Sequence, residues 1–218
     1  MKVGTDGVLV GAWATVRPGA VVWDAGAGSG LISLMCAQRG ASRVTAFEID
    51  PAACGAARRN VAASPWHDII TVEEGDFVSR AAALEGDAPD LIVSNPPFFN
   101  ETLHAPDPER AAARHEGGMT ITDIMRVAAA RLAPGGRLAL IAPTNRMEEL
   151  LFEARMARLW PLRITSIVTV EGKKPKRWLV EWTTTDPLSR PAESVLAIRG
   201  RDNVFTAAYG RLVGDFYL

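Results

Sequence analysis

The stretch DLIVSNPPFFNE, at positions 90–101, ends a predicted buried strand with a side-chain amide and two prolines. The side-chain oxygen of Asn95 and the carbonyl oxygen of Pro96 can both accept hydrogen bonds from one NH₂ group. They would position its nitrogen and direct its lone pair at an electrophile. Pro96 and Pro97 stiffen the backbone, and Phe98 offers a face on which a planar group can stack. A simple proline turn would also end a strand, but the aromatic residue favours a clamp for a planar substrate that carries NH₂.

A glycine-rich turn lies between a predicted strand and a predicted helix in VVWDAGAGSGL. Gly26, Gly28 and Gly30 let the backbone approach a ligand, although an ordinary tight turn has the same pattern. Asp24 precedes the turn and would repel a pyrophosphate, so it suits a ligand with positive charge. Glu48, about 20 residues beyond the turn, ends the next strand, where a carboxylate holds ribose hydroxyls. S-adenosylmethionine meets both conditions because it has an ammonium group and a ribose but no phosphate, whereas a nicotinamide dinucleotide meets only the second.

Further strand ends extend the predicted cofactor site. Asp76 and Phe77, in EEGDF, end the third predicted strand, where Asp76 can meet the adenine amino group and Phe77 can cover the ring. For Asp76 alone, a helix N-cap is an equally good interpretation. We also assign Ile49, which follows Glu48, and Asn95, which lies beside the glycine turn, to the cofactor site. Ligands of such sheets lie at the carboxyl ends of the strands.

Strand-like and helix-like segments alternate along the chain. Such units imply a parallel sheet covered on both faces, because parallel strands need crossover connections. The last two predicted strands, 162–171 and 177–185, form an antiparallel hairpin at the sheet edge. We therefore expect an α/β, Rossmann-like fold with a seven-stranded, mostly parallel sheet and a C-terminal antiparallel hairpin, in a single domain over residues 1–218. The other predicted strands are 20–26, 42–50, 68–76, 89–95 and 136–143, and the predicted helices are 29–40, 51–63, 120–136 and 145–160.

The composition is that of an ordinary globular protein, with 48% apolar and 22% charged residues and a formal net charge of −1. Any contact with nucleic acid must therefore use a local basic patch. Cys36 and Cys54 are expected to be buried free thiols, which suits a reducing compartment. The N-terminal segment is too short to span a membrane and has no cleavage-site pattern. We expect a cytoplasmic protein without a metal, since the few His and Cys residues lack ligand spacing.

A basic cluster in EGKKPKRW occupies the turn between the last two predicted strands. It contains Lys173, Lys174, Lys176 and Arg177. If the strand before it runs parallel to the others, this turn shares an edge with the glycine turn and Asn95. It would then bind phosphates on either side of an extruded base, although a hairpin kept soluble by its lysines is the plainer interpretation.

The polar segment 104–118 follows the clamp and contains Arg114 and His115. It is a candidate lid over the target nucleotide. For His115 alone, a surface position without a function is the simpler interpretation.

Motifs along nearly the whole chain resemble, in order, the bacterial tRNA (adenine-N6)-methyltransferases that modify the adenine next to the anticodon of a valine tRNA. The matching stretches are KVGTDG, DAGAGSG, FEID, GDF, NPPFF, ARHE and the final DFYL. The Asn-Pro-Pro-aromatic tetrad is shared with DNA adenine, ribosomal RNA guanine and release-factor glutamine methyltransferases. It therefore indicates which type of atom is methylated and does not indicate the substrate. KVGTDG and DFYL point to the tRNA group. Members of this group usually carry a further N-terminal stretch before KVGTDG, whereas this sequence begins at Met1.

This resemblance implies a class I methyltransferase that uses S-adenosylmethionine, releases S-adenosylhomocysteine and acts on tRNA without an evident protein partner. It places Thr5 and Asp6 in a segment that folds over the methionine end of the cofactor. It also implies that Arg114 and His115, in ARHE, contact the substrate. Its remaining assignments agree with those above: a cofactor turn at Asp24, Gly26 and Gly28, a ribose contact at Glu48, an adenine contact at Asp76 and Phe77, and a target-base clamp at residues 95–98.

Three alternatives stay open. The same chemistry would serve N5-methylation of a glutamine amide in a protein such as a release factor. A nicotinamide oxidoreductase is disfavoured by Asp24 and by the lack of a hydride-transfer constellation. An RNA-binding module with a vestigial cofactor fold would be indifferent to the cofactor.

Overall fold

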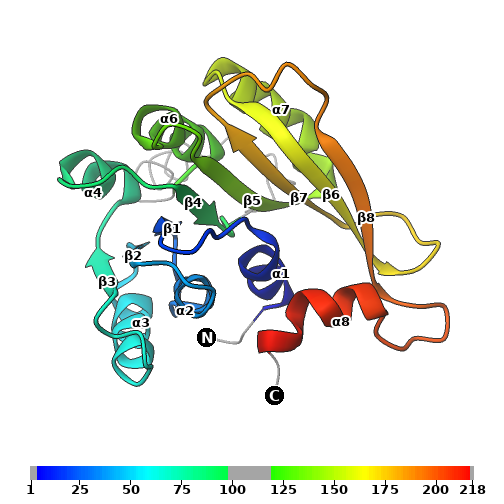
Figure 1. Cartoon of the computed structure of the whole chain (residues 1–218), viewed down its shortest axis with the longest axis horizontal. Coiled ribbons are helices and arrows are strands. Elements are labelled where there is room, and N and C mark those ends of the chain that lie inside the picture. Colours follow the sequence, from blue (N-terminus) through cyan, green and yellow to red (C-terminus); the bar gives the residue numbers. More distant parts are fainter. Residues whose placement is uncertain (1–3, 98–118, 217–218) are drawn as a thin grey trace, which may run out of the picture.

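The structure is a computed structural model that describes residues 4–97 and 119–216, and a single eight-stranded sheet runs through it (Figure 1). The strand order is β3-β2-β1-β4-β5-β7-β6-β8. Neighbouring strands from β3 to β5 are parallel, β7 is antiparallel to both β5 and β6, and β8 is parallel to β6. The strands are β1 (Val21–Ala25), β2 (Arg43–Glu48), β3 (Ile70–Glu74), β4 (Leu91–Ser94), β5 (Arg137–Pro143), β6 (Trp160–Val170), β7 (Arg177–Thr183) and β8 (Ala192–Arg199).

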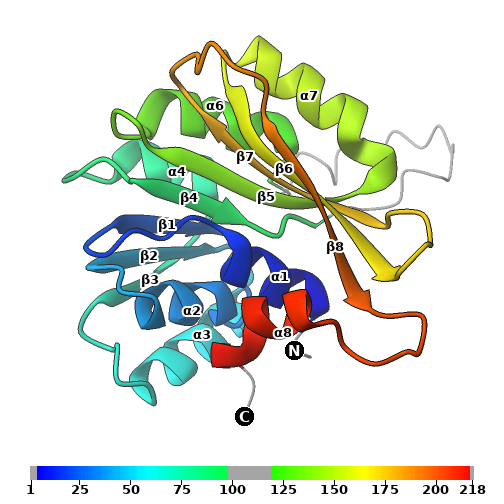
Figure 2. The same cartoon turned by 45° about the vertical axis from the view of Figure 1, so that its right-hand side comes forward.

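Helices cover both faces of the sheet. α1, α2, α3 and α8 lie on one side, and α4, α6 and α7 lie on the other (Figure 2). None of the helices in residues 4–97 and 119–216 is long and apolar enough to cross a membrane. The helices are α1 (Thr5–Trp13), α2 (Leu31–Gln38), α3 (Pro51–Ala62), α4 (Phe77–Ala83), α6 (Ile121–Arg131), α7 (Met147–Met156) and α8 (Ala207–Val213), with 3₁₀ turns at Thr144–Arg146 and Gly214–Phe216.

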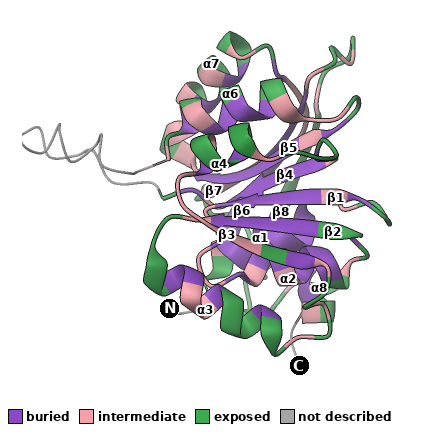
Figure 3. Ribbon diagram, turned by 90° about the vertical axis from the view of Figure 1, so that its left-hand side faces the viewer, coloured by how far each residue is buried: buried purple, intermediate pink, exposed green. Residues whose placement is uncertain are grey.

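The central strands are short and apolar because both of their faces are buried, as Figure 3 shows. In β4, Leu91 and Val93 face the hydrophobic cluster beneath α1 and α2, whereas Ile92 faces the cluster beneath α6 and α7. All three side chains are fully buried. The predicted Rossmann-like α/β architecture is therefore confirmed.

The sheet has eight strands, and the prediction of seven was wrong because residues 192–199 form β8. The antiparallel β6–β7 hairpin is confirmed, but β8 pairs with β6, so the hairpin lies inside the sheet and not at its edge. β8 has a weak sequence signal because it is itself an edge strand. Its residues up to Val195 are exposed, and Leu196 is its buried side chain.

α1 is a helix that the sequence patterns do not indicate, since its segment TDGVLVGAW contains two glycines. Each glycine disfavours a helix by about 1 kcal/mol relative to alanine. A Cβ atom on Gly11 would lie 2.8 Å from Sδ of Met35, and one on Gly7 would lie 3.5 Å from a methyl group of Leu31. The glycines therefore allow α1 to pack closely on α2.

A buried carboxylate on β7 fixes the end of α1 to the sheet. Glu181 is fully buried, and its Oε1 accepts a 2.6 Å hydrogen bond from the backbone N–H of Thr15, just after α1. Its Oε2 accepts hydrogen bonds from Thr15 Oγ1 (3.0 Å) and from Nη1 of Arg137 on β5 (2.9 Å). Nη2 of Arg163 on β6 lies 3.2 Å from Oε1. One side chain thus connects α1 with two neighbouring strands.

We expect Glu181→Ala to lower the free energy of unfolding by about 3 kcal/mol or more. The substitution removes the carboxylate that two partly buried arginines and the backbone N–H of Thr15 contact. Urea unfolding measures this change. Asp87→Ala is the control, since Asp87 pairs with Arg43 at the surface and its loss should cost less than about 1 kcal/mol. Equal losses in the two variants would contradict the structural role of Glu181.

Candidate active site

Three predicted site residues meet at the carboxyl edge of the sheet because β1 lies between β2 and β4. Asp24 pairs with Val93 in the β1–β4 register, so Asn95 lies two residues further along, beside the turn that follows β1. Glu48 ends β2 on the other side of β1. The fold therefore brings the clamp and both carboxylates to one place.

The glycine turn has a backbone that only glycine adopts readily. Gly26, Gly28 and Gly30 have φ angles of 73°, 58° and 82°. The backbone N–H groups of Gly26 and Ala27 both donate to the carbonyl oxygen of Phe47, and that of Gly30 donates to Ala27, each at 2.9 Å. A turn that binds phosphate leaves such amides free for the ligand. Here these N–H groups donate to carbonyl oxygens of the protein itself, and this favours a ligand without phosphate.

Asp24 is fully buried with one carboxylate oxygen unused. Its Oδ2 accepts a 2.7 Å hydrogen bond from Ser33 Oγ, but Oδ1 has no hydrogen-bond partner within residues 4–97 and 119–216. Burial raises the pKa of Asp24 to about 7, although hydrogen bonds from Ser33 lower it and Glu48 raises it slightly further. A buried acceptor without a partner fits a cationic ligand group, such as the ammonium group of S-adenosylmethionine.

Glu48 lies at the predicted strand end, but its carboxylate already contacts the backbone. Oε2 accepts from the N–H of Gly28 at 2.7 Å, and Oε1 accepts from the N–H of Asp50 at 2.9 Å. A carboxylate oxygen can accept more than one hydrogen bond, so a ribose contact stays a prediction. Ile49 beside it is 43% exposed, an unusual position for isoleucine and one open to a ligand.

Asp76 and Phe77 both have roles in the protein itself. Asp76 Oδ1 accepts from the backbone N–H and the hydroxyl of Ser79, at 2.9 and 2.8 Å, and so caps α4. Phe77 is 3% exposed and its ring packs edge-on against Phe47, with centroids 5.2 Å apart. The capping interpretation of Asp76 is confirmed, and the adenine contacts of both residues stay predictions.

The strand that carries Asn95 is tied directly to the cofactor turn. Ser94 is fully buried, and its hydroxyl donates a 2.6 Å hydrogen bond to the carbonyl oxygen of Ala25, immediately before Gly26. Asn95 itself is half-buried, Pro96 is buried and Pro97 is exposed. The predicted contacts Phe98, Arg114 and His115 lie outside the described residues.

Three residues near the site are not indicated by the motifs. Ser33 and Ser94 are polar residues within otherwise apolar stretches, a signal from which their hydrogen bonds to this edge can be inferred. Met119 has no such signal. Its Cε would lie 3.2 Å from a Cβ placed on Gly26, so its side chain borders the glycine turn.

Comparisons with known proteins agree with this geometry. Residues 7–159 match the methyltransferase small domain family. A protein from Porphyromonas gingivalis named tRNA1(Val) (adenine(37)-N6)-methyltransferase is 44% identical over 100% of this chain and 89% of its own length. A protein of the same name from Aeromonas hydrophila is 40% identical over 100% of this chain and 91% of its own. The chain belongs to this methyltransferase family.

The fold is also that of a methyltransferase. The crystal structure of a predicted O-methyltransferase from Agrobacterium tumefaciens superposes with a TM-score of 0.75 at 23% identity, and the match covers 96% of each chain. At this identity the likeness establishes the fold alone. The predicted class I methyltransferase fold is thereby confirmed, with one strand more than expected.

Asp6 and Arg177, which were predicted to contact the cofactor and the RNA, form an ion pair with each other. Nε of Arg177, at the start of β7, lies 2.7 Å from Oδ2 of Asp6 in the first turn of α1, and each side chain is about one-third exposed. Thr5 is exposed at the same end of α1. The pair holds the beginning of α1 at the carboxyl edge, so the phosphate contact predicted for Arg177 would have to compete with Asp6.

The basic turn does share the edge with the clamp. Since β7 is antiparallel to both β5 and β6, β6 runs in the same direction as β5, and its end lies at the carboxyl edge. Lys173 and Lys176 are exposed in the turn that follows. This part of the prediction is confirmed, and contact with RNA stays a prediction. The described part of the chain contains no group of three or more His, Cys, Asp or Glu side chains suited to a metal.

Replacing Asp24 by Asn removes the titrating group of the methyltransferase and keeps the shape of the side chain. The pKa in the folded chain, about 7, exceeds the ordinary value of 3.8. Stability from the protonated carboxyl is therefore complete below about pH 4 and is lost as the pH rises to about 7. Without ligand, Asp24→Asn should melt about 5 °C above the wild type at pH 8, with a much smaller difference at pH 5. Thermal melts at the two pH values measure this.

The matched control is Asp87→Asn, because Asp87 is exposed and pairs with Arg43 at the surface. It should show no pH-dependent gain. A melting difference for Asp24→Asn that is the same at pH 5 and pH 8 would contradict the unpaired buried charge.

Proposed function

We propose that this protein transfers the methyl group of S-adenosylmethionine to the exocyclic N6 of an adenine in tRNA, the adenine next to the anticodon of a valine tRNA. S-adenosylhomocysteine is the second product. The proposal is carried by the 2.6 Å hydrogen bond between Ser94 and Ala25, which holds the Asn-Pro-Pro clamp against the cofactor turn. It is supported by full-length relatives named for this reaction.

The residues at the carboxyl edge fit the proposed cofactor. Asp24, buried with a free oxygen, would hold the ammonium group, and Glu48 would hold the ribose. Thr5 and Asp6 would cover the methionine end, since α1 begins at the same edge. The adenine would be bounded by Ile49, Asp76 and Phe77. When bound, the cofactor supplies the sulfonium methyl group.

Asn95 and Pro96 position the amino group of the substrate. An exocyclic amine of adenine is a weak nucleophile because its lone pair is delocalised into the ring. Two fixed acceptors hold both N–H bonds and leave the lone pair directed at the methyl donor. Pro97 limits the movement of the turn, and Phe98 would stack on the base. No strong base is needed if the proton leaves after the transfer.

The RNA would extend from the clamp toward the exposed lysines. Lys173 and Lys176 lie on the same edge as Asn95 and would bind phosphates flanking the extruded base. Arg177 would join them by exchanging Asp6 for a phosphate, and Arg114 and His115 would contact the nucleotide itself. The proposed tRNA substrate places the reaction in the cytoplasm, and we propose that residues 1–218 form one catalytic domain.

The function is tested by offering the protein tritiated S-adenosylmethionine together with total RNA that lacks the modification. We expect N6-methyladenosine in a single tRNA band after digestion to nucleosides. Label in a protein with none in RNA would select the glutamine amide instead. Protection against melting by NADH, and none by S-adenosylhomocysteine, would indicate an oxidoreductase.

Asn95→Ala should lower kcat about 100-fold or more, because it removes one of the two acceptors that position the amine. Gln38→Ala is the matched loss of a side-chain amide, since Gln38 lies on α2, where its amide donates a hydrogen bond to the carbonyl oxygen of Asp215. It should leave kcat unchanged. Single-turnover methylation rates measure both variants, and a wild-type rate in Asn95→Ala would refute the clamp.

A further inference from the structure

Positive charge is concentrated in two adjacent connections of the chain. Three of its four lysines, at positions 173, 174 and 176, fall in the β6–β7 turn. Residues 171–177 and 199–205 together carry six basic and two acidic side chains, although the whole chain has a net charge of −1. Such an excess at one place in a nearly neutral protein is the electrostatic pattern of a phosphate-binding surface.

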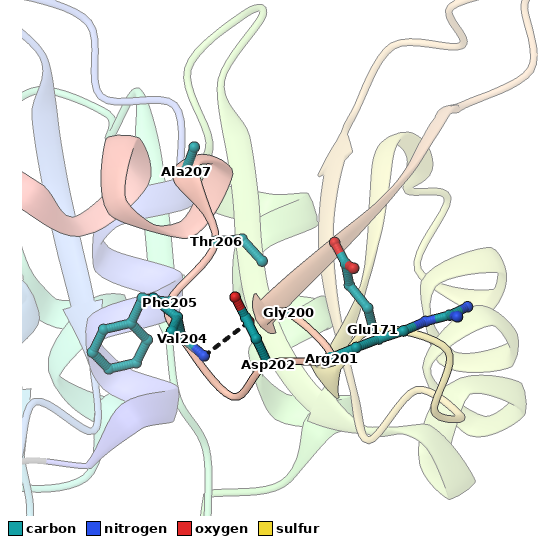
Figure 4. Close-up of a pocket in the computed structure, with 8 residues that line it drawn as sticks. All are labelled: Glu171, Gly200, Arg201, Asp202, Val204, Phe205, Thr206 and Ala207. Atoms are coloured by element: carbon teal, nitrogen blue, oxygen red, sulfur yellow. Dashed lines mark hydrogen bonds between the residues drawn. The ribbon is translucent and has the colours of Figure 1, made fainter.

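The loop between β8 and α8, residues 200–206, lies directly beside the lysine turn. The N–H of Glu171 donates to the carbonyl oxygen of Arg199 at 2.9 Å, and the guanidinium of Arg201 lies 3.8 Å from a Cβ placed on Gly172. The two connections border a hollow of about 510 Å³, with Arg201 and Phe205 on opposite sides of it (Figure 4). The hollow lies at the same edge of the sheet as Asp24 and Asn95, since β8 is parallel to β6, but neither of those residues lines it.

Phe205 adds an exposed aromatic side chain to the basic loop. Phe205 is 55% exposed, and its ring lies under the guanidinium of Arg199, whose Cζ is 4.2 Å from the ring centroid. Tyr209 on α8 is tilted against it, with centroids 5.1 Å apart. An exposed aromatic ring that is stacked with arginine offers a flat surface for a base and a cation for the adjoining phosphate.

The backbone of the loop is held in place without any ligand. The N–H of Gly200 donates to the carbonyl oxygen of Val204 at 2.8 Å, and the N–H of Val204 donates to Oδ1 of Asp202 at 3.1 Å. The N–H of Asn203 donates to the carbonyl oxygen of Gly200 at 3.0 Å. These hydrogen bonds fix the backbone that carries Phe205 before a ligand binds, and this lowers the entropic cost of binding.

We propose that the β8–α8 loop is a second RNA-binding element, in which Phe205 stacks on a base and Arg199 and Arg201 bind phosphates. Four strand intervals separate β4 from β8, a distance of roughly 19 Å across the edge. The loop therefore contacts nucleotides other than the adenine held by Asn95. This inference rests on the proposed tRNA methylation and assigns the protein a second site on the same substrate.

The test compares methylation of total tRNA that lacks the modification by the wild type and by two loop variants. Phe205→Leu keeps an apolar side chain without the flat ring and should raise KM for tRNA about tenfold, with kcat and affinity for S-adenosylhomocysteine unchanged. Phe152→Leu is the matched control, since Phe152 is 61% exposed on the outer surface of α7. It should leave KM at the wild-type value.

A second variant tests the charges without touching the ring. Arg201→Gln should weaken tRNA binding and reduce the slope of log Kd against log salt concentration by about 0.7–0.9. Glu171→Gln removes an acidic side chain from the same hollow and should have the opposite effect on affinity.

The possible outcomes separate this inference from the proposed function. Wild-type protein that methylates no RNA refutes the function, and the second site with it. Methylation of tRNA with wild-type KM and salt dependence in both loop variants refutes the second site alone. A fall in melting temperature or cofactor affinity in Phe205→Leu, together with unchanged salt dependence in Arg201→Gln, assigns the loop a structural role and also overturns the proposal.

Discussion

The proposed cofactor site depends on a buried carboxylate, one oxygen of which has no hydrogen-bond partner in the described part of the chain. Asp24 lies at the end of β1, where burial favours its protonated form and, within the described ranges, only Ser33 donates a hydrogen bond to its carboxylate. An apolar residue would stabilise this position in the isolated protein, since a buried charge without a partner is costly. The charge is useful only to a cationic ligand, and the glycine turn beside it keeps its amides for Phe47 and Glu48. Under the proposed function, the buried charge would lower the stability of the protein without ligand and would allow the site to recognise an ammonium group.

The repeating part of the fold was predictable from the sequence because its signals are local. Apolar runs buried on both faces indicate the central strands, and Pro51 and the Thr120 capping box mark the beginnings of α3 and α6. The elements that were not predicted are the short helices α4 and α8, together with α1 and β8, whose stability comes from distant partners. α1 contains two glycines because it packs against Met35, and the first half of β8 is exposed because the strand forms an edge.

The position of the site was predictable, but several of its contacts were not. Residues at the ends of parallel strands meet at one edge in any sheet of this order, so Asp24, Glu48 and Asn95 follow from their places in the chain. The pairing of Asp6 with Arg177 joins residues 171 positions apart, and no local pattern encodes it. Arg177 lies in a basic run, and from the sequence alone this run indicates a phosphate contact. The structure shows that its guanidinium is paired with the carboxylate of Asp6.

α1 connects the two functions of the carboxyl edge. Its end is fixed by Thr15, whose backbone and hydroxyl both donate to buried Glu181, whereas its beginning is held by the partly exposed pair of Asp6 and Arg177. The buried attachment is the stronger of the two, because a carboxylate outside water loses little to solvent competition. The exposed pair is the weaker one, and a phosphate is a suitable competitor for its guanidinium. Under the proposed function, RNA that engages Arg177 would act on the segment assigned to cover the cofactor, and α1 would then couple the two binding events.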